Sequence, residues 1–321
     1  MTETQGKAPL VAVIGLGLMG RSIVACLLAA GHAVVGVTDD LEQSADVPKR
    51  VEELLREISA ERLFAGDVGE AVGRLQITDD TKRMKDAELV IESVTEDLTL
   101  KKQLLQQSEA VVSASCLLAS NTSALPVSLL QDGLMHPERV LGIHWDEPAH
   151  VTRFLEIIPG TMTSNEVLDR AAAWALQWGK KPSTLRKEIR GFITNRISYA
   201  MFREACHLVD SGVCSVEDVD RSLRNDVGWW IPFAGPFRYM DLMGVEAYHR
   251  VMKDLLPDLN SSTAVPKLID DVVASGGRGI RNGRGFYSYT PEEAAEWERR
   301  FLEFNYRIRR LTADYPDAGT S

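Results

Sequence analysis

A glycine-rich turn, GLGLMG at residues 15–20, constrains the fold of this chain more than any other segment. It follows the wholly apolar run LVAVI (10–14), which is typical of a parallel strand buried on both faces. A helical pattern then runs from about residue 20 to residue 30, and a second apolar run, AVVGV, occupies residues 33–37. Together these segments predict a strand–helix–strand unit of about thirty residues.

The glycine turn predicts a dinucleotide site. Gly15 would permit the tight turn, Gly17 would let a pyrophosphate approach the backbone, and Gly20 would let helix and strand pack closely. Leu18 and Met19 fall where the helix begins, and the free N–H groups and positive dipole of a helix N-terminus favour phosphate. A GxGxxG pattern inside a βαβ unit is a much more specific signal than the same pattern alone.

The end of the second strand selects the cofactor. It reads VTDD, with Asp39 and Asp40 as its acids. A carboxylate at this place accepts hydrogen bonds from the adenosine ribose and would repel the 2′-phosphate of NADP. No arginine immediately follows. The sequence therefore predicts NAD as cofactor, with Asp39 as the candidate ribose ligand and Asp40 as the alternative.

The rest of the chain separates into a sheet-forming part and a helical part. A charged, mainly helical stretch at 47–75 precedes further short apolar runs, with helices expected at 97–111 and 165–178. The expected strands are LQIT (75–78), ELVIES (88–93), CLLAS (116–120), VLGIH (140–144), FLEIIPG (154–160) and an edge strand in PSTLRKE (182–188).

After about Arg190 the chain carries apolar residues at helical spacing and almost no strand signal. Two capping-box patterns, Ser215 with Asp218 and Thr290 with Glu293, predict helix starts. We therefore expect an α/β, doubly wound Rossmann-type domain over 1–188 that binds NAD. An all-α domain over 189–321 would follow it and serve substrate binding and dimerisation.

Composition excludes several classes of function. The net charge of −10 gives no basic excess for nucleic acid or an anionic membrane. No apolar run reaches the ~20 residues of a membrane helix, and Met1–Pro9 lacks an apolar signal core. The four cysteines form no C-x-x-C pair and no zinc-ligand spacing. We expect a cytoplasmic protein with reduced cysteines and no metal site.

Several motifs, in order along nearly the whole chain, resemble the L-3-hydroxyacyl-CoA dehydrogenase family. Their order and spacing together are far more specific than any one motif. The resemblance implies a doubly wound N-terminal domain and a helical C-terminal domain that usually forms a homodimer, here through helices within 191–250. The motifs are GLGLMG, VTEDLTLKK (94–102), SNTS (120–123), GIH (142–144), FLEI (154–157), GFITNR (191–196), GPF (235–237) and GRGFYSYT (283–290).

A catalytic base is expected at His144. Oxidation of an alcohol by hydride transfer needs a base for the hydroxyl proton, and the pKa of histidine lies near neutrality. His144 ends an apolar strand, where ligand sites of α/β sheets gather. Glu156 lies within the apolar run FLEII, where a carboxylate needs a partner. The resemblance assigns the same pair, with Glu156 orienting His144.

The resemblance also implies roles for four other residues. It assigns Ser123 to the substrate hydroxyl and nicotinamide, and Asn195 to the substrate carbonyl. Glu96 and Lys101 match positions near the nicotinamide-side ribose, with a solvated helix start as the alternative. An apolar cluster before GPF, formed by Trp229, Trp230 and Phe233, predicts core or dimer packing, with a wall of the substrate pocket as the alternative. His150 is a further candidate for a place near the pocket.

This sequence departs from the family pattern in two places near the cofactor. The acid after the second strand comes one position later than usual, at Asp39. The loop after the base reads HWDEP where the family commonly has HFFNP, so Glu147 replaces an asparagine near the nicotinamide. Asp146 and Glu147 would pair with Arg153, or would favour a polyhydroxy or cationic substrate. We expect this loop, with Arg153, to set substrate identity.

Three functions remain open on the sequence alone. The first is NAD-dependent oxidation of an L-3-hydroxyacyl-CoA, as in fatty acid metabolism, with Arg50, Arg56 and Arg62 as candidates for the coenzyme A phosphates. The second is oxidation of a free 3-hydroxy acid, because parts of the C-terminal half are similar to the L-gulonate and L-carnitine dehydrogenase branch. The third is a non-catalytic NAD(H)-binding protein, which the set of catalytic candidates disfavours.

Overall fold

The computed structural model describes residues 8–315, and the chain divides between Phe192 and Ile193 into two compact units. The N-terminal unit extends a few residues past the boundary expected at 188. Phe192 is buried in the same hydrophobic cluster as Leu118 and Val140, which explains why the unit continues to that residue. No helix within 8–315 is both long and apolar enough to cross a membrane.

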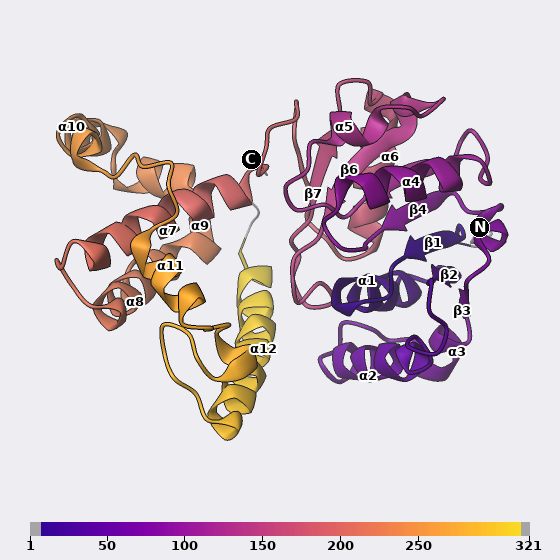
Figure 1. The fold of residues 1–321 in the computed structure, drawn as a ribbon, viewed down its shortest axis with the longest axis horizontal. Coiled ribbons are helices and arrows are strands. Elements are labelled where there is room, and N and C mark those ends of the chain that lie inside the picture. The colour runs from indigo at the N-terminus through magenta and orange to yellow at the C-terminus, as the bar shows by residue number, and fades with distance from the viewer. Residues whose placement is uncertain (1–7, 316–321) are drawn as a thin grey trace. The chain divides into compact units, whose positions relative to one another are not determined.

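The N-terminal unit is built on one eight-stranded sheet with the order β3-β2-β1-β4-β5-β6-β7-β8 (Figure 1). All neighbouring strands run parallel except β6 and β7, which pair antiparallel. The reversal of strand order between β1 and β4 confirms the doubly wound Rossmann-type fold. The strands are β1 Val11–Ile14, β2 Val34–Val37, β3 Leu75–Thr78, β4 Leu89–Glu92, β5 Leu117–Ser120, β6 Val140–His144, β7 Glu156–Pro159 and β8 Ser183–Thr184.

The central strands are apolar except at their carboxyl ends, because both faces of the sheet are covered. On one face, Ala12 and Val90 pack in a cluster with Leu105 of α4 (Leu98–Glu109) and Val127 of α5 (Val127–Gln131). Helix α1 (Leu18–Ala29) connects β1 to β2 on the opposite side of the strands (Figure 1). Helix α6 (Asn165–Gln177) follows β7, and short 3₁₀ turns occur at η1 Thr81–Met84 and η2 Pro137–Arg139.

Two segments of this unit differ from expectation. The stretch 47–75 is two helices, α2 (Val47–Ala60) and α3 (Val68–Val72), with a break between them. The chain leaves the helical conformation at Arg62, which has φ 60°, and restarts where the Asp67 carboxylate accepts the Glu70 N–H at 2.8 Å. The edge strand expected at 182–188 is reduced to Ser183–Thr184.

The C-terminal unit is helical, as expected. Its two predicted capping boxes, at Ser215 and Thr290, are both formed. The GPF motif interrupts α9 (Val227–Met243), because Gly235 has φ 68° and Pro232 and Pro236 flank it. Of the described residues after 192, only isolated bridges at Arg284 make strand-like pairs. The helices are α7 Thr194–Asp210, α8 Val216–Asn225, α9 Val227–Met243, α10 Val245–Leu255, α11 Lys267–Ala274 and α12 Pro291–Ala313, with 3₁₀ turns η3 Leu256–Asp258 and η4 Ile280–Asn282.

Candidate functional site

The glycine turn has the open backbone surface that a pyrophosphate requires. Gly15 has φ 91°, and a Cβ there would lie 2.7 Å from the Ser93 carbonyl oxygen. A Cβ on Gly20 would lie 1.9 Å from the Gly15 oxygen, so helix and turn are in direct contact. At Gly17 a Cβ would meet nothing within 4 Å, so this side of the turn is open where α1 begins at Leu18. These residues fit a dinucleotide.

The two acids after β2 have different surroundings. Asp40 accepts the Gln43 backbone N–H at 2.9 Å and so holds its own turn. Asp39 is exposed, and its carboxylate accepts no hydrogen bond from any residue between 8 and 315. Asp39 therefore has the more accessible carboxylate, and its role as the ribose ligand stays a prediction.

We expect Asp39→Ala to lower the preference for NAD over NADP by roughly 10- to 100-fold, the equivalent of one hydrogen bond to a charged group. Dissociation constants of NADH and NADPH, measured by fluorescence titration, test this ratio. Asp40→Ala is the matched control, since its carboxylate is engaged in the turn. An unchanged ratio in Asp39→Ala with a lowered ratio in Asp40→Ala would transfer the role to Asp40.

The antiparallel pairing of β6 and β7 brings His144 and Glu156 together. The strand register places the two residues directly opposite each other. The His144 Nδ1 lies 2.9 Å from the Glu156 Oε2, and the side chains are only 6% and 1% exposed. Because an ionised carboxylate only accepts, Nδ1 carries the proton and Nε2 holds the free lone pair. Nε2 is therefore the atom that can take a proton from a substrate.

Two aromatic rings pack against the imidazole. The ring centroids of Phe154 and Phe192 each lie 5.4 Å from that of His144. Phe192 is buried and has φ 52°, an uncommon conformation for a residue with a side chain. The rings restrict the orientation of the imidazole and limit the access of water to it.

Glu96 organises the SNTS loop after β5. Its Oε1 accepts the Thr122 hydroxyl at 2.5 Å and the backbone N–H groups of Ser123 and Ala124 at 3.0 and 3.2 Å. Partial burial by itself would raise the pKa of Glu96, but the Thr122 hydrogen bond and the charge of Lys101 outweigh it and lower the pKa. Ser123 is exposed on this loop, so an ionised Glu96 supports the loop that presents Ser123.

Lys101 does not lie on a solvated helix face. Its ammonium is fully buried and donates to the two Glu92 carboxylate oxygens at 2.8 and 3.0 Å, with Glu96 3.3 Å away. The Ser120 hydroxyl completes the cluster by donating to Glu92 at 2.5 Å. Lys101 is thus placed to hold Glu96, and its expected contact with the cofactor ribose stays a prediction.

The loop after His144 is anchored on α1, the helix that follows the glycine turn. On α1, the Cys26 thiol donates to the Ala149 carbonyl at 3.5 Å, and Ser22 Oγ lies 2.8 Å from the His150 Nδ1. The His150 Nε2 lies 3.1 Å from a Glu57 carboxylate oxygen of α2. The buried Lys180 ammonium donates to the Ala149 carbonyl as well. His150 therefore fastens this loop, a role the sequence did not reveal.

Two predicted substrate residues lie in different units. Arg153 is half-buried in the loop between β6 and β7 of the N-terminal unit, and its carbonyl accepts the Lys181 N–H at 2.9 Å. Asn195 lies in the first turn of α7, in the C-terminal unit. Their roles toward the substrate stay predictions.

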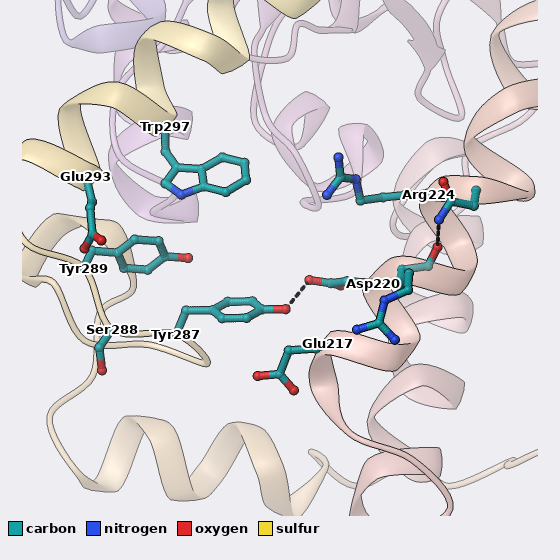
Figure 2. A pocket seen from close by; sticks show the side chains of 10 residues that line it. Glu217, Asp220, Arg224, Tyr287, Ser288, Tyr289, Glu293 and Trp297 are labelled. Carbon is teal, nitrogen blue, oxygen red and sulfur yellow. Dashed lines mark hydrogen bonds between the residues drawn. The ribbon is translucent and has the colours of Figure 1, made fainter.

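A pocket of about 600 Å³ lies in the C-terminal unit between α8, the GRGFYSYT segment and α12 (Figure 2). Within it the Tyr287 hydroxyl donates to the Asp220 carboxylate at 2.8 Å, which raises the pKa of Tyr287 to about 12. This bond fastens the segment to α8 and gives the GRGFYSYT motif a structural role. None of the residues predicted to be catalytic lines this pocket.

The three aromatic residues before GPF differ in their exposure to solvent. Trp230 is half-buried and stacks on Tyr239 with ring centroids 4.3 Å apart, as core packing requires. Trp229 and Phe233 are exposed, at 77% and 52%. They line an apolar groove between α9 and α12.

Two family models match most of the chain. The model of the 3-hydroxyacyl-CoA dehydrogenase NAD-binding domain matches residues 10–189, and that of the family's C-terminal domain matches 191–289. A 5-formyl-3-hydroxy-2-methylpyridine 4-carboxylate 5-dehydrogenase from Mesorhizobium japonicum is 31% identical over 94% of this chain and 97% of its own. The human mitochondrial hydroxyacyl-coenzyme A dehydrogenase is 29% identical over 87% of this chain and 90% of its own.

Solved structures show the same relationships. The structure of a dehydrogenase of that pyridine carboxylate, described as an NAD⁺-dependent dismutase, matches with a TM-score of 0.89 and 28% identity, covering 96% of this chain and 99% of the other. The (S)-3-hydroxybutyryl-CoA dehydrogenase of Ralstonia eutropha matches with a TM-score of 0.72 and 27% identity, covering 88% and 99%.

Proposed function

The chain belongs to the 3-hydroxyacyl-CoA dehydrogenase family and uses NAD, and from this premise we propose that it oxidises a small free carboxylic acid, not a CoA thioester. The carbon to be oxidised would carry a hydroxyl, either as a hydroxy acid or as the hydrate of an aldehyde acid. The observation that carries this proposal is the charge balance of the helix on which coenzyme A contacts were expected.

Helix α2 offers no cationic excess to the phosphates of coenzyme A. Between Val47 and Ala60 it carries three basic and three acidic residues, and two of the bases, Arg50 and Arg56, are paired with acids. Arg50 lies 3.2 Å from both Asp46 and Glu53, and Arg56 lies 2.5 Å from Glu52. Exposed ion pairs such as these are individually weak. The net charge of the helix, which is zero, is what disfavours the binding of a multiply charged ligand.

The relationship to a pyridine-carboxylate enzyme supports the same proposal. That relative aligns with almost the entire length of both chains, and its name describes a free carboxylate that bears a formyl group. Its substrate has no coenzyme A portion. Arg153, in the loop that follows the base, is our candidate for the substrate carboxylate.

The proposed chemistry follows from the His144 geometry. NAD supplies the hydride acceptor when bound. His144 Nε2 takes the hydroxyl proton of the substrate, and the Glu156 carboxylate stabilises the resulting imidazolium through Nδ1 without becoming protonated. Ser123 would hold the substrate hydroxyl against Nε2, and Asn195 would hold its carbonyl.

A substrate panel tests the proposal. We expect NAD reduction with L-gulonate, L-carnitine or the formylpyridine carboxylate, and a kcat/KM at least about tenfold lower with acetoacetyl-CoA and NADH. A kcat/KM for acetoacetyl-CoA above those of all the free acids would overturn the proposal in favour of an acyl-CoA substrate. Binding of NADH without turnover of any compound would instead favour a non-catalytic sensor.

We also propose a homodimer formed through the C-terminal helices. Large apolar side chains are exposed on α9 and α12, including Trp229, Phe301 and Phe304, each more than half exposed. Such a concentration of exposed aromatic surface is typical of an interface between subunits. A monomer in sedimentation velocity at micromolar concentration would contradict the proposal.

A further inference from the structure

The side chain of Asn121, the second residue of the SNTS motif, joins the ends of two strands that are not neighbours in the sheet. Its Nδ2 donates to the Ser93 hydroxyl at 3.1 Å, just after β4, and its Oδ1 accepts the Trp145 N–H at 2.9 Å, just after β6. Asn121 itself follows β5, the strand between these two. The two side-chain hydrogen bonds form a bridge, the Asn121 bridge, across the carboxyl ends of the three strands.

The bridge continues the alignment of β5 with β6 beyond their backbone ladder. The paired residues of these strands end at Ser120 and Gly142, two positions before His144. On its other side, β6 stays paired with β7 as far as His144 and Glu156. A backbone ladder thus aligns His144 with its acid, whereas toward β5 the side chain of Asn121 continues the contact where the ladder stops.

Two residues expected to act on the substrate lie at opposite ends of the contact between Asn121 and Trp145. Ser123 follows Asn121 by two positions and is exposed on the SNTS loop. His144 directly precedes Trp145 and is the last residue of β6. The hydrogen bond therefore joins the loop that presents Ser123 to the strand that carries the base.

Both ends of the Asn121 bridge are held in place by other contacts. The Ser93 N–H donates to the Ile14 carbonyl of β1 at 2.7 Å. The indole of Trp145 is buried and stacks on that of Trp178, with ring centroids 5.5 Å apart. The bridge therefore connects two fixed points of the sheet.

The contact with Trp145 requires an oxygen at position 121. A backbone N–H only donates, so the amide oxygen of Asn121 faces Trp145 and its NH2 group faces the Ser93 hydroxyl. Trp145 is only 2% exposed, so loss of the acceptor would leave a buried N–H unpaired. An aspartate keeps the oxygen, and the Ser93 hydroxyl can turn to donate to it. A leucine has a similar size and offers no acceptor.

We propose that Asn121 is a positioning residue that sets the distance between the base at His144 and the SNTS loop that presents Ser123. The inference rests on the proposed function, which takes His144 as the base and Ser123 as the residue that holds the substrate hydroxyl. Without the bridge, the end of β6 and the loop are free to separate. A displacement of about 1 Å between reacting groups lowers a rate by about 10²-fold.

Amide hydrogen exchange tests the bridge without a substrate. Protein labelled with ¹⁵N-tryptophan contains six labelled backbone amides, and Trp145→Phe identifies the signal of Trp145. We expect Asn121→Leu to raise the exchange rate of the Trp145 N–H at least about tenfold, and Asn121→Asp to keep it within about threefold of wild type. The Trp178 N–H, which donates to the Trp174 carbonyl at 3.1 Å, should keep its rate and so serves as an internal control.

Ser93→Ala is the matched control for this measurement. It removes the other hydrogen bond of the same amide and leaves the one that reaches β6. The Trp145 N–H should therefore stay protected in Ser93→Ala. Asn121→Ala replaces the leucine variant if that protein does not fold.

Turnover links the bridge to catalysis. The substrate is whichever of L-gulonate, L-carnitine and acetoacetyl-CoA the wild type converts fastest. We expect Asn121→Leu to lower kcat by about 10- to 100-fold with a smaller change in KM, and Asn121→Asp to retain most of the activity. In a Ser123→Ala background the same leucine change should cost less than about threefold, because the group that the bridge aligns is already absent.

Equal exchange of the Trp145 N–H in wild type and Asn121→Leu would overturn the proposal. An undiminished loss of kcat in the Ser123→Ala background would also overturn it, because the two residues would then act independently. An equal rise in the exchange of the Trp178 N–H would show a general loss of stability and refute a specific role. If no compound is turned over, the proposed function fails, and the exchange rates alone decide whether Asn121 holds β6 to the SNTS loop.

Discussion

Replacing His144 with alanine is expected to lower kcat by about 10²- to 10⁴-fold, the usual contribution of a general base, while the NADH dissociation constant changes little. The imidazole is held by Glu156, Phe154 and Phe192, and none of its described contacts is with the glycine turn. Its removal therefore eliminates the proton acceptor and leaves the glycine turn intact. Steady-state turnover and fluorescence titration of NADH separate the two effects.

A control is needed because alanine also leaves the buried Glu156 carboxylate without its partner. His144→Gln supplies an amide donor to Glu156 but has no basic nitrogen, so it should lose turnover with less loss of stability. Glu156→Gln should also lower kcat, because an amide N–H directed at Nδ1 would force the proton onto Nε2. Loss of NADH binding in a folded His144→Gln protein would place this histidine in the cofactor site and contradict its assignment as base.

Replacing Lys101 with methionine is expected to reduce the free energy of unfolding of the N-terminal unit by about 3–5 kcal/mol. The ammonium and the Glu92 carboxylate are both fully buried, and the substitution would leave Glu92 as an uncompensated charge beneath the SNTS loop. The change also frees Glu96 from one of its two principal supports. Urea denaturation followed by circular dichroism measures the loss.

Lys102→Met is the matched control, one residue along the same helix. Lys102 pairs with Asp132 at 2.6 Å where Asp132 is largely exposed, and such a pair contributes about 0–1 kcal/mol. Glu92→Gln combined with Lys101→Met should recover part of the stability, because the buried charge is then removed with its partner. Equal losses in the free energy of unfolding for Lys101→Met and Lys102→Met would show that the buried pair contributes no more to stability than the exposed one.

The sheet was largely predictable because its strands are buried on both faces. Runs such as LVAVI and VLGI have no polar positions, and the structure places strands within a residue or two of the expected ends. The break after α2 was not predictable from apolar spacing, because Glu61 and Arg62 both suit a helix, yet the helix ends at Ala60 and Arg62 has φ 60°. The helical second domain followed from the change in periodicity after Arg190.

The site was predictable where a local pattern showed that a polar group must be buried. Glu156 in FLEII implied a partner, and the structure supplies His144. The same reasoning applied to Glu92 in ELVIES would have found the buried pair with Lys101. The anchor formed by Ser22 and His150 gave no such signal, because the two residues are 128 positions apart and neither interrupts an apolar run.

His144 and Glu156 are aligned by the backbone ladder of two adjacent strands, and not by the chain that connects those strands. Their separation depends on the register of β6 against β7, which buried apolar neighbours such as Ile143 and Ile157 enforce. The sequence of the loop between β6 and β7 can therefore change in evolution while the pairing of His144 with Glu156 is kept. For protein engineering, grafting that loop from relatives of different specificity is a route to new substrates that leaves the reaction itself unchanged.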